Sequence, residues 1–161
     1  MTKHYSVDGR PVCGAFGILS TNDVKEVTCP DCLDIIKHPH CVFCGIVASR
    51  SDVLYQDTHA IVIEPLNPVV PGHVIAISKA HVRNATVLPS VTAMTVRALA
   101  QYVRNVQSVR ETQDWYESYN MITSAGHPAT QSVFHLHIHL VPRTFGDGLL
   151  LPWSKQKGEQ S

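Results

Sequence analysis

The pattern of apolar and polar positions predicts a set of short strands and one long helix after residue 40. Apolar residues near helical spacing, such as Val91, Ala98 and Tyr102, are typical of an amphipathic helix, and short apolar or alternating runs are typical of strands. The helix is predicted from Ser90 to about Gln113. The predicted strands are Val53–Gln56, Ala60–Ile63, His73–Ile77, Tyr116–Thr123 and Val133–Val141.

Three histidines, His135, His137 and His139, occupy alternate positions in the last predicted strand. Side chains along a strand point alternately to opposite faces, so the three imidazoles are predicted to line one face. The leucine and isoleucine residues between them would pack on a core. Imidazole near neutral pH serves as a nucleophile, a proton carrier, a hydrogen-bond donor to an anion or a metal ligand. The strand is therefore predicted to form part of a catalytic or ligand-binding site.

The spacing suits a phosphate group, because residues two apart on a strand lie about 6.5–7 Å apart. His137 can attack phosphorus while His139 donates a hydrogen bond to a phosphate oxygen, which divides the reaction into two displacements. Ser132, just before the strand, is placed to help hold the developing negative charge. Two alternatives stay open: a three-histidine zinc centre with an open position for water, and an edge strand with surface histidines.

Composition limits the function classes. The chain has 161 residues, with 13 Lys plus Arg and 13 Asp plus Glu, so no basic excess favours nucleic-acid binding. No stretch reaches the roughly 20 apolar residues that a membrane span needs. The N-terminal residues lack the apolar run of a secretory signal, which predicts a cytoplasmic protein.

The five cysteines predict metal binding rather than disulfides. Their number is odd, and four of them form the pairs Cys29/Cys32 and Cys41/Cys44 with two residues between the partners. In a reducing compartment such pairs indicate a metal site. Residues 1–40 are too few to hold themselves together through a core, so a small zinc-stapled extension is predicted there. A main domain over 41–153 and a polar tail over 154–161 complete the predicted organisation.

The motif Gln131–Arg143 resembles the signature of the histidine-triad (HIT) family of nucleotide hydrolases and transferases. The resemblance extends through Cys41–Ile46, Pro68–His73 and Ser78–His81 in the family's order, and it covers roughly residues 41–153. It implies an α+β fold with a five-stranded antiparallel sheet and one long helix through which the chain forms a homodimer. It also implies a small nucleotide conjugate as substrate and no catalytic metal.

The resemblance assigns roles to individual residues. His137 corresponds to the histidine that is transiently nucleotidylated at the α-phosphorus, and His139 to a phosphate contact. Ser132 and Gln131 correspond to residues on the phosphate and leaving-group side. His73 corresponds to the histidine after Pro-Gly, for which a structural role and a chemical role are equally compatible with the sequence.

Three positions depart from the family's pattern. The usual ribose-binding aspartate is replaced in register by Pro65, with Glu64 one residue earlier, and a one-residue slip on a strand reverses the side-chain face. Ser124 stands where many members have asparagine, and a hydroxyl makes fewer contacts than an amide. Thr130 replaces a usual glycine. The catalytic centre is predicted to persist, with altered contacts to the nucleoside.

Two structural zinc sites are predicted. Some branches of the family bind zinc between residues that correspond to Cys41, Cys44, His81 and His135, a closed set of two thiolates and two imidazoles. The remaining donors, His4, Cys13, Cys29 and Cys32, form a second candidate site in the extension. The competing assignment places the two cysteine pairs in one four-thiolate site. His38 and His40 are spare donors that are predicted to face solvent.

The predicted function is hydrolysis, or nucleotidyl transfer, at the α-phosphate of a nucleoside phosphoramidate, dinucleoside polyphosphate or similar conjugate. Trp153 is predicted to close the substrate pocket or the dimer seam, or to cover apolar surface. A second hypothesis is a non-catalytic module that senses nucleotides or acts as an adaptor through the zinc-binding extension. The third is a hydrolytic zinc enzyme that uses the three histidines as ligands.

Overall fold

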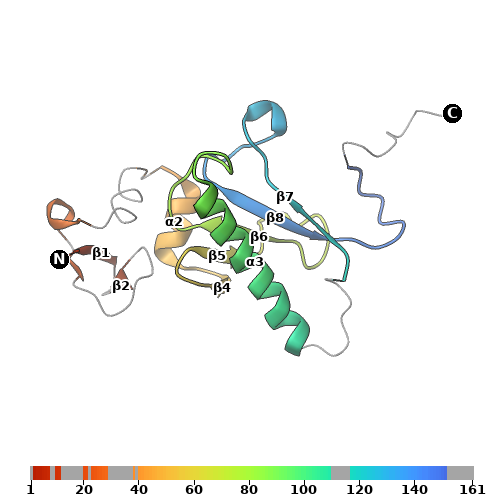
Figure 1. Cartoon of the computed structure of the whole chain (residues 1–161), viewed down its shortest axis with the longest axis horizontal. Coiled ribbons are helices and arrows are strands. Elements are labelled where there is room, and N and C mark those ends of the chain that lie inside the picture. The colour runs from red at the N-terminus through yellow and green to blue at the C-terminus, as the bar shows by residue number, and fades with distance from the viewer. Residues whose placement is uncertain are drawn as a thin grey trace.

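A five-stranded antiparallel sheet forms the centre of the molecule in this computed structural model (Figure 1). The structure describes residues 2–7, 10–11, 20–21, 23–28, 38, 40–109 and 117–151. The spatial order of the strands is β4-β5-β6-β8-β7. Their bounds are Val53–Gln56 for β4, Ala60–Ile63 for β5, Val74–Ser78 for β6, Tyr119–Ile122 for β7 and His137–Pro142 for β8.

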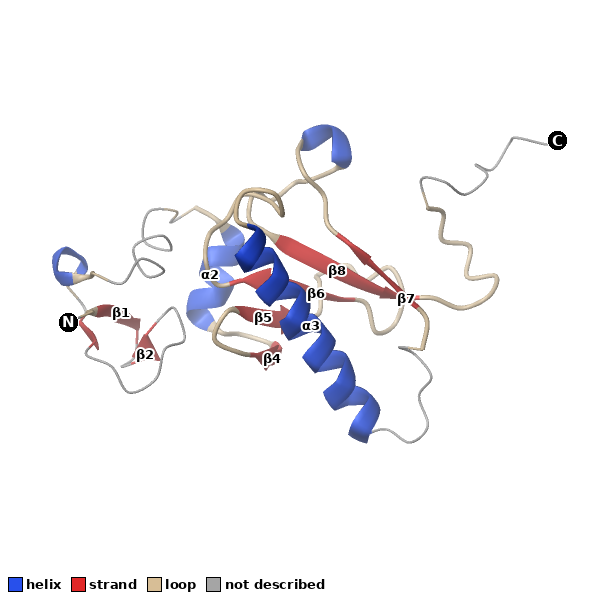
Figure 2. Ribbon diagram, in the orientation of Figure 1, coloured by secondary structure: helices blue, strands red, loops and turns tan. Residues whose placement is uncertain are grey.

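Two helices cover opposite faces of this sheet, α2 (Val42–Ser49) and α3 (Pro89–Val109). Figure 2 shows α3 crossing in front of the sheet, with α2 at the left of the view. The strands β5 and β6 are buried at every position because both of their faces are covered. The predicted α+β fold with a five-stranded antiparallel sheet and one long helix is therefore confirmed.

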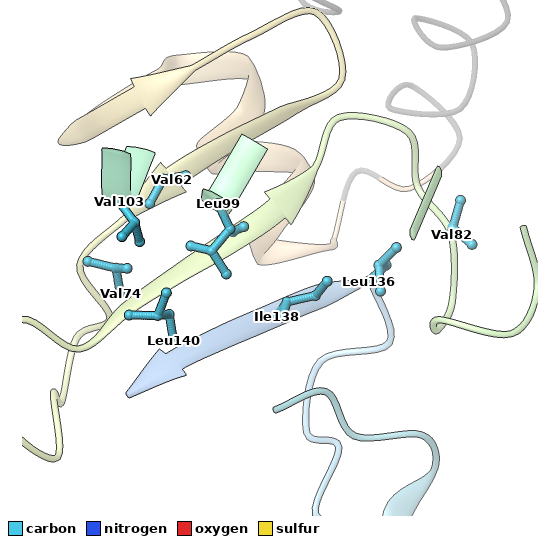
Figure 3. Packing of buried hydrophobic residues seen from close by; sticks show 9 residues of the cluster. Val62, Val74, Val82, Leu99, Val103, Leu136, Ile138 and Leu140 are labelled. Atoms are coloured by element: carbon cyan, nitrogen blue, oxygen red, sulfur yellow. The ribbon is translucent and has the colours of Figure 1, made fainter. Parts of the chain in front are cut away.

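The core has one layer on each side of the sheet. Under α3, the side chains of Leu136, Ile138 and Leu140 pack with those of Leu99 and Val103 (Figure 3). Under α2, a second cluster of buried side chains holds Val27, Cys44, Val47, Ile61, Ile63, Ile75 and Ile77. This arrangement confirms that the apolar residues between the histidines pack on a core.

Several predicted boundaries were wrong. The last strand begins at His137 rather than at residue 133, because the chain bends over 133–135 before the regular ladder starts. The strand predicted from His73 begins one residue later and ends at Ser78. The helix begins at Pro89, one residue earlier than predicted, and is described as far as Val109. Arg110–Tyr116 lie outside the described residues, so the predicted end near Gln113 stays a prediction.

The described part of the extension packs against the main domain. Three short strands, β1 (His4–Val7), β2 (Arg10–Pro11) and β3 (Ser20–Thr21), form a small sheet in the order β2-β1-β3, and a 3-10 helix (Val24–Glu26) follows. Val27, only 6% exposed, enters the core cluster beneath α2. The predicted boundary near residue 40 stays a prediction, but the extension shares the core of the domain that follows it.

The exposed surface of α3 carries Met94 and Val96, each 37% exposed. These residues suit the predicted dimer contact, which stays a prediction. Within the ranges given above, the helices are all too short or too polar to cross a membrane.

Candidate active site and metal centre

His137 and His139 lie on the face of β8 that looks toward α2. Their partners in the neighbouring strand are Ile77 and Ile75, whose side chains belong to the cluster under α2. The ring of His137 makes an edge contact with the ring of Phe43 at a centroid distance of 5.0 Å. Period-two alternation therefore places these two imidazoles together, as predicted. His135 lies just before the strand, but its ring is also on the side of α2, with its centroid 6.0 Å from that of Phe43. The three imidazoles therefore lie on one side as predicted, and only the predicted start of the strand was wrong.

A backbone hydrogen bond sets the tautomer of His137. Its Nδ1 lies 2.7 Å from the carbonyl oxygen of His135. A carbonyl oxygen only accepts, so Nδ1 carries the proton, and in the neutral ring Nε2 holds the lone pair. Across the described residues, no hydrogen bond engages this Nε2. The ring is 8% exposed and thus presents one oriented nucleophilic nitrogen in a largely buried setting.

A second chain of hydrogen bonds sets the tautomer of His139. The backbone N–H of Val69 donates to Nδ1 of His73 at 3.2 Å. In neutral His73 the proton therefore lies on Nε2, which is 2.9 Å from Nδ1 of His139 and donates to it. This leaves Nε2–H of His139 as a donor. His73 thus orients His139. Of the structural and chemical roles that the sequence left open for His73, this geometry favours the structural one.

Both rings of this pair are held neutral. Burial, with smaller contributions from the neighbouring His137 and His73, lowers the pKa of His139 to about 4. Burial also lowers the pKa of His73, while the charge of Glu64 opposes this shift. A neutral His139 donates one hydrogen bond to an anion without carrying a proton that it must later lose.

The depressed pKa of His139 predicts a loss of stability in acid. An unfolded imidazole has a pKa of about 6.5. Between pH 6.5 and the folded value of about 4, the unfolded chain binds a proton that the folded chain does not, so the free energy of unfolding falls as the pH falls. In the His139→Asn variant, the slope of the unfolding free energy against pH should fall by an amount that corresponds to up to about one bound proton. Urea unfolding at several pH values, with chelator present for both proteins, measures it; equal slopes would contradict the assignment.

Gln131 holds the loop before β8 instead of facing a ligand. Its side chain is 2% exposed, and Oε1 accepts a hydrogen bond from Gly126 N–H at 2.8 Å. Its Nε2 donates to the carbonyl oxygens of Arg83 and Val133 at 2.7 and 3.1 Å. The amide is fully engaged within the protein, so its geometry favours positioning of the loop over the predicted direct contact with substrate.

The other predicted loop residues stay accessible. Ser132 is exposed and Ser124 is half-buried. Thr130 has φ of 65°, a left-handed conformation that glycine adopts without penalty and that a β-branched residue adopts with strain. The backbone shape usually supplied by glycine is therefore kept, although the residue has changed.

Glu64 is exposed, directly after the end of β5. The regular alternation of the strand stops at Ile63, so the slip inferred from the sequence does not fix the direction of its side chain. Its negative charge opposes the lowering of the His73 pKa. Trp153 lies outside the described residues, and its predicted role is untested.

Cys41, Cys44, His81 and His135 come together as a candidate metal centre. Their donor atoms all lie within 4.8 Å of one another. His135 Nδ1 is 3.5 Å from both sulfur atoms, and His81 Nδ1 is 3.1 Å from Cys44 Sγ. A tetrahedron around zinc, with Zn–S of about 2.3 Å and Zn–N of about 2.0 Å, has edges of about 3.3–3.8 Å. The four donors therefore fit a structural zinc ion.

His135 links this centre to the catalytic strand. Its Nε2 lies 2.7 Å from the carbonyl oxygen of Ser78, so Nε2 carries the proton and Nδ1 faces the cysteines with its lone pair. Its own carbonyl oxygen accepts the hydrogen bond from His137. Because the three histidine rings have separate partners, they do not converge on one point, which disfavours the three-histidine zinc centre.

Of the second predicted zinc site, only the backbone of His4 is described, and Cys13, Cys29 and Cys32 lie outside the described residues. That site stays a prediction. His38 was wrongly predicted to face solvent: it is half-buried and stacks on His81, with ring centroids 3.6 Å apart. Nothing in the local sequence signals this contact, because His81 is a distant position in the chain.

Arg143 is committed to the chain itself. Its guanidinium donates to both oxygens of Asp147 at 2.6 and 3.0 Å, to Asn120 Oδ1 at 2.6 Å and to the carbonyl oxygen of Leu149 at 2.8 Å. These hydrogen bonds hold the pKa of the Asp147 carboxyl well below its usual range. These contacts fix the turn after β8.

Comparison with known proteins agrees with this geometry. The model of the HIT domain family matches residues 48–146, more than half of the chain. A HIT family hydrolase from Clostridium thermocellum has a similar structure, with 33% identity and a TM-score of 0.54, over 70% of this chain and 97% of that one. The chain belongs to the HIT domain family.

Two other similar proteins bear on the chemistry of the site. Adenylylsulfatase HINT3 of Arabidopsis thaliana is 32% identical over 68% of this chain and 55% of that protein. The structure of a zinc-bound histidine triad family protein from Mycobacterium smegmatis is 33% identical, with a TM-score of 0.57, over 70% of this chain and 81% of that one.

Proposed function

We propose that this chain hydrolyses nucleotide conjugates, or transfers their nucleotidyl group, through a covalent intermediate on His137. The observation that carries the proposal is the hydrogen bond from His137 Nδ1 to the carbonyl oxygen of His135, which leaves the Nε2 lone pair for attack. Nε2 attacks the α-phosphorus, the new P–N bond forms and the bond to the leaving group breaks. Water then breaks the P–N bond and releases the nucleoside monophosphate.

The neighbouring residues support this reaction without a catalytic metal ion. The Nε2–H of neutral His139 is placed to donate to a phosphate oxygen, and Ser132 is exposed beside the loop that Gln131 holds. Zinc held by Cys41, Cys44, His81 and His135 would act structurally, because its four protein donors leave no open position. We propose one such zinc ion per chain. A second zinc ion in the extension would require His4, Cys13, Cys29 and Cys32 to come together.

The substrate class follows from the chemistry of a nucleotidylated imidazole. Phosphate and sulfate suit the first step because they leave as stable anions, and an amine suits it once its nitrogen has taken a proton from solvent. Dinucleoside polyphosphates, adenylyl sulfate and phosphoramidates are therefore all candidates. HINT3 is an adenylylsulfatase by name. We therefore include a sulfate conjugate in the test.

The test is incubation of the full chain with adenosine phosphoramidate, diadenosine tetraphosphate and adenylyl sulfate, each labelled in the adenylyl group. Rapid acid-free quenching should reveal a transient protein adduct that is lost on acid treatment, and chromatography should show AMP. Calorimetric binding of AMP with no product from any substrate would instead support the non-catalytic nucleotide-sensing module. Neither binding nor product would remove both hypotheses.

A further inference from the structure

The candidate metal centre has an inner half and an outer half. Cys44 and His135 are 2% and 0% exposed, so the sheet and α2 already seal these two donors. Cys41 and His81 are only half-buried. A metal ion at this site would therefore exchange through the side formed by Cys41 and His81, where solvent and competing ligands have access.

His38 contacts both donors of the outer half. Its ring stacks on His81 at a centroid distance of 3.6 Å and an interplanar angle of 10°. Its carbonyl oxygen accepts a hydrogen bond from the backbone N–H of Cys41 at 3.0 Å. His38 is not one of the four residues whose donor atoms converge. It therefore restrains the ring of one ligand and the backbone of another without supplying a donor itself.

Val27 seals the same region from a different part of the extension. It is 6% exposed and belongs to the buried cluster with Cys44 and Val47, against which Cys41 also packs. The segment around it, directly after the 3-10 helix, is fixed by two hydrogen bonds: Thr28 N–H donates to the Lys3 carbonyl oxygen at 2.9 Å, and Lys3 N–H donates to the side-chain Oγ1 of Thr28 at 2.7 Å. Two separated points of the extension thus converge on one metal centre.

We propose that the N-terminal extension is a cap on the zinc centre, in which His38 and Val27 slow the exchange of the metal. The match to the family model begins at residue 48, so the capping residues precede the matched part of the chain. The proposal depends on the metal centre proposed above and is independent of the chemistry at His137. It gives the extension a function that needs no partner molecule and no second zinc ion.

The test is the rate at which zinc passes from the full-length protein to an excess of a coloured chelator. Loss of residues that orient metal ligands commonly weakens metal binding by about 10- to 100-fold. We expect release at least about tenfold faster from His38→Ala and from Val27→Ala. His40→Ala is the matched control for the first variant, because His40 is exposed. Val42→Ala is the control for the second, because Val42 is 55% exposed and adjacent to Cys41. Both controls should release zinc at the wild-type rate.

Cobalt substitution separates a cap from a ligand. The visible spectrum of cobalt bound to two thiolates and two imidazoles should be the same in wild type and His38→Ala, because the four donors are unchanged. A changed spectrum would make His38 a ligand and overturn the cap, as would equal release rates for His38→Ala and His40→Ala. Circular dichroism of each variant shows whether the fold is kept. A wild-type protein that binds no zinc would overturn the metal centre together with the cap, while leaving the proposed reaction at His137 intact.

Discussion

Replacing His137 with asparagine is expected to lower kcat/KM for a nucleotide conjugate by at least about a thousandfold. The imidazole Nε2 forms the bond to phosphorus, and an asparagine amide has no comparable nucleophilic lone pair. Its amide N–H can still donate to the carbonyl oxygen of His135, so the local hydrogen bond is replaced rather than lost. The measurement is the rate of AMP release, with quenched samples assayed for the protein adduct.

The matched control for this variant is His59→Asn. His59 is exposed, and only its backbone makes the recorded hydrogen bonds, with Asp57 and Lys79. Its activity should stay within about twofold of wild type, as for most surface substitutions away from a site. Near-wild-type turnover by a folded His137→Asn protein would refute the covalent mechanism. Loss of turnover with retained AMP binding would separate the chemical step from ligand recognition.

The predictable parts of this fold are those that depend on local periodicity. Alternation along β8 was enough to place Ile138 and Leu140 under α3 and the imidazoles of His137 and His139 on the other face. Spacing along α3 was enough to predict a helix, and Ala98 of the predicted apolar stripe is buried. The buried Leu99 and Val103 beside it were not part of the prediction. These features need no knowledge of distant parts of the chain.

The parts that could not be predicted depend on contacts between distant segments. The amide of Gln131 donates a hydrogen bond to the carbonyl oxygen of Arg83, 48 positions earlier. The residue type of Gln131 and its place in the motif did not reveal this partner. The ring of His135 lies between Ser78 and the cysteines, and the Ser78 and Cys44 partners are 57 and 91 positions away in the sequence. Alternation along the strand predicted the side of the sheet for this ring but not these contacts. The stacking of His38 on His81 is likewise invisible in the local sequence.

Residue type also misled where the backbone had its own requirement. The replacement of glycine by Thr130 suggested a changed loop, yet Thr130 itself adopts the left-handed conformation that glycine favours. Arg143 follows a proline at the end of a strand, where an arginine is usually solvated, yet Asp147 and Asn120 engage its guanidinium. In both cases the sequence gives the chemical group, while the structure decides whether that group is available.

Replacing Cys44 with alanine is expected to abolish zinc binding and to make stability independent of chelator. Wild type should lose about 4 kcal/mol of unfolding free energy when zinc at a thousand times its Kd is removed by chelator, since the folded state alone holds the complete donor set. Cys44 supplies one thiolate and also packs in the core, so part of the loss in the variant arises from the missing side chain. Denaturant unfolding with and without chelator, together with elemental analysis, measures both effects.

Val47→Ala separates these two effects, because Val47 is 0% exposed in the same helix and cluster but has no metal donor. This variant should be less stable than wild type while keeping one zinc ion and the full loss of unfolding free energy on chelation.

The metal centre also bears on catalysis, since His135 offers Nδ1 to the metal and its carbonyl oxygen to His137. Chelation should therefore lower kcat in Val47→Ala and wild type alike, and should leave the residual activity of Cys44→Ala unchanged. A chelator response that persists in Cys44→Ala would place the metal elsewhere in the chain.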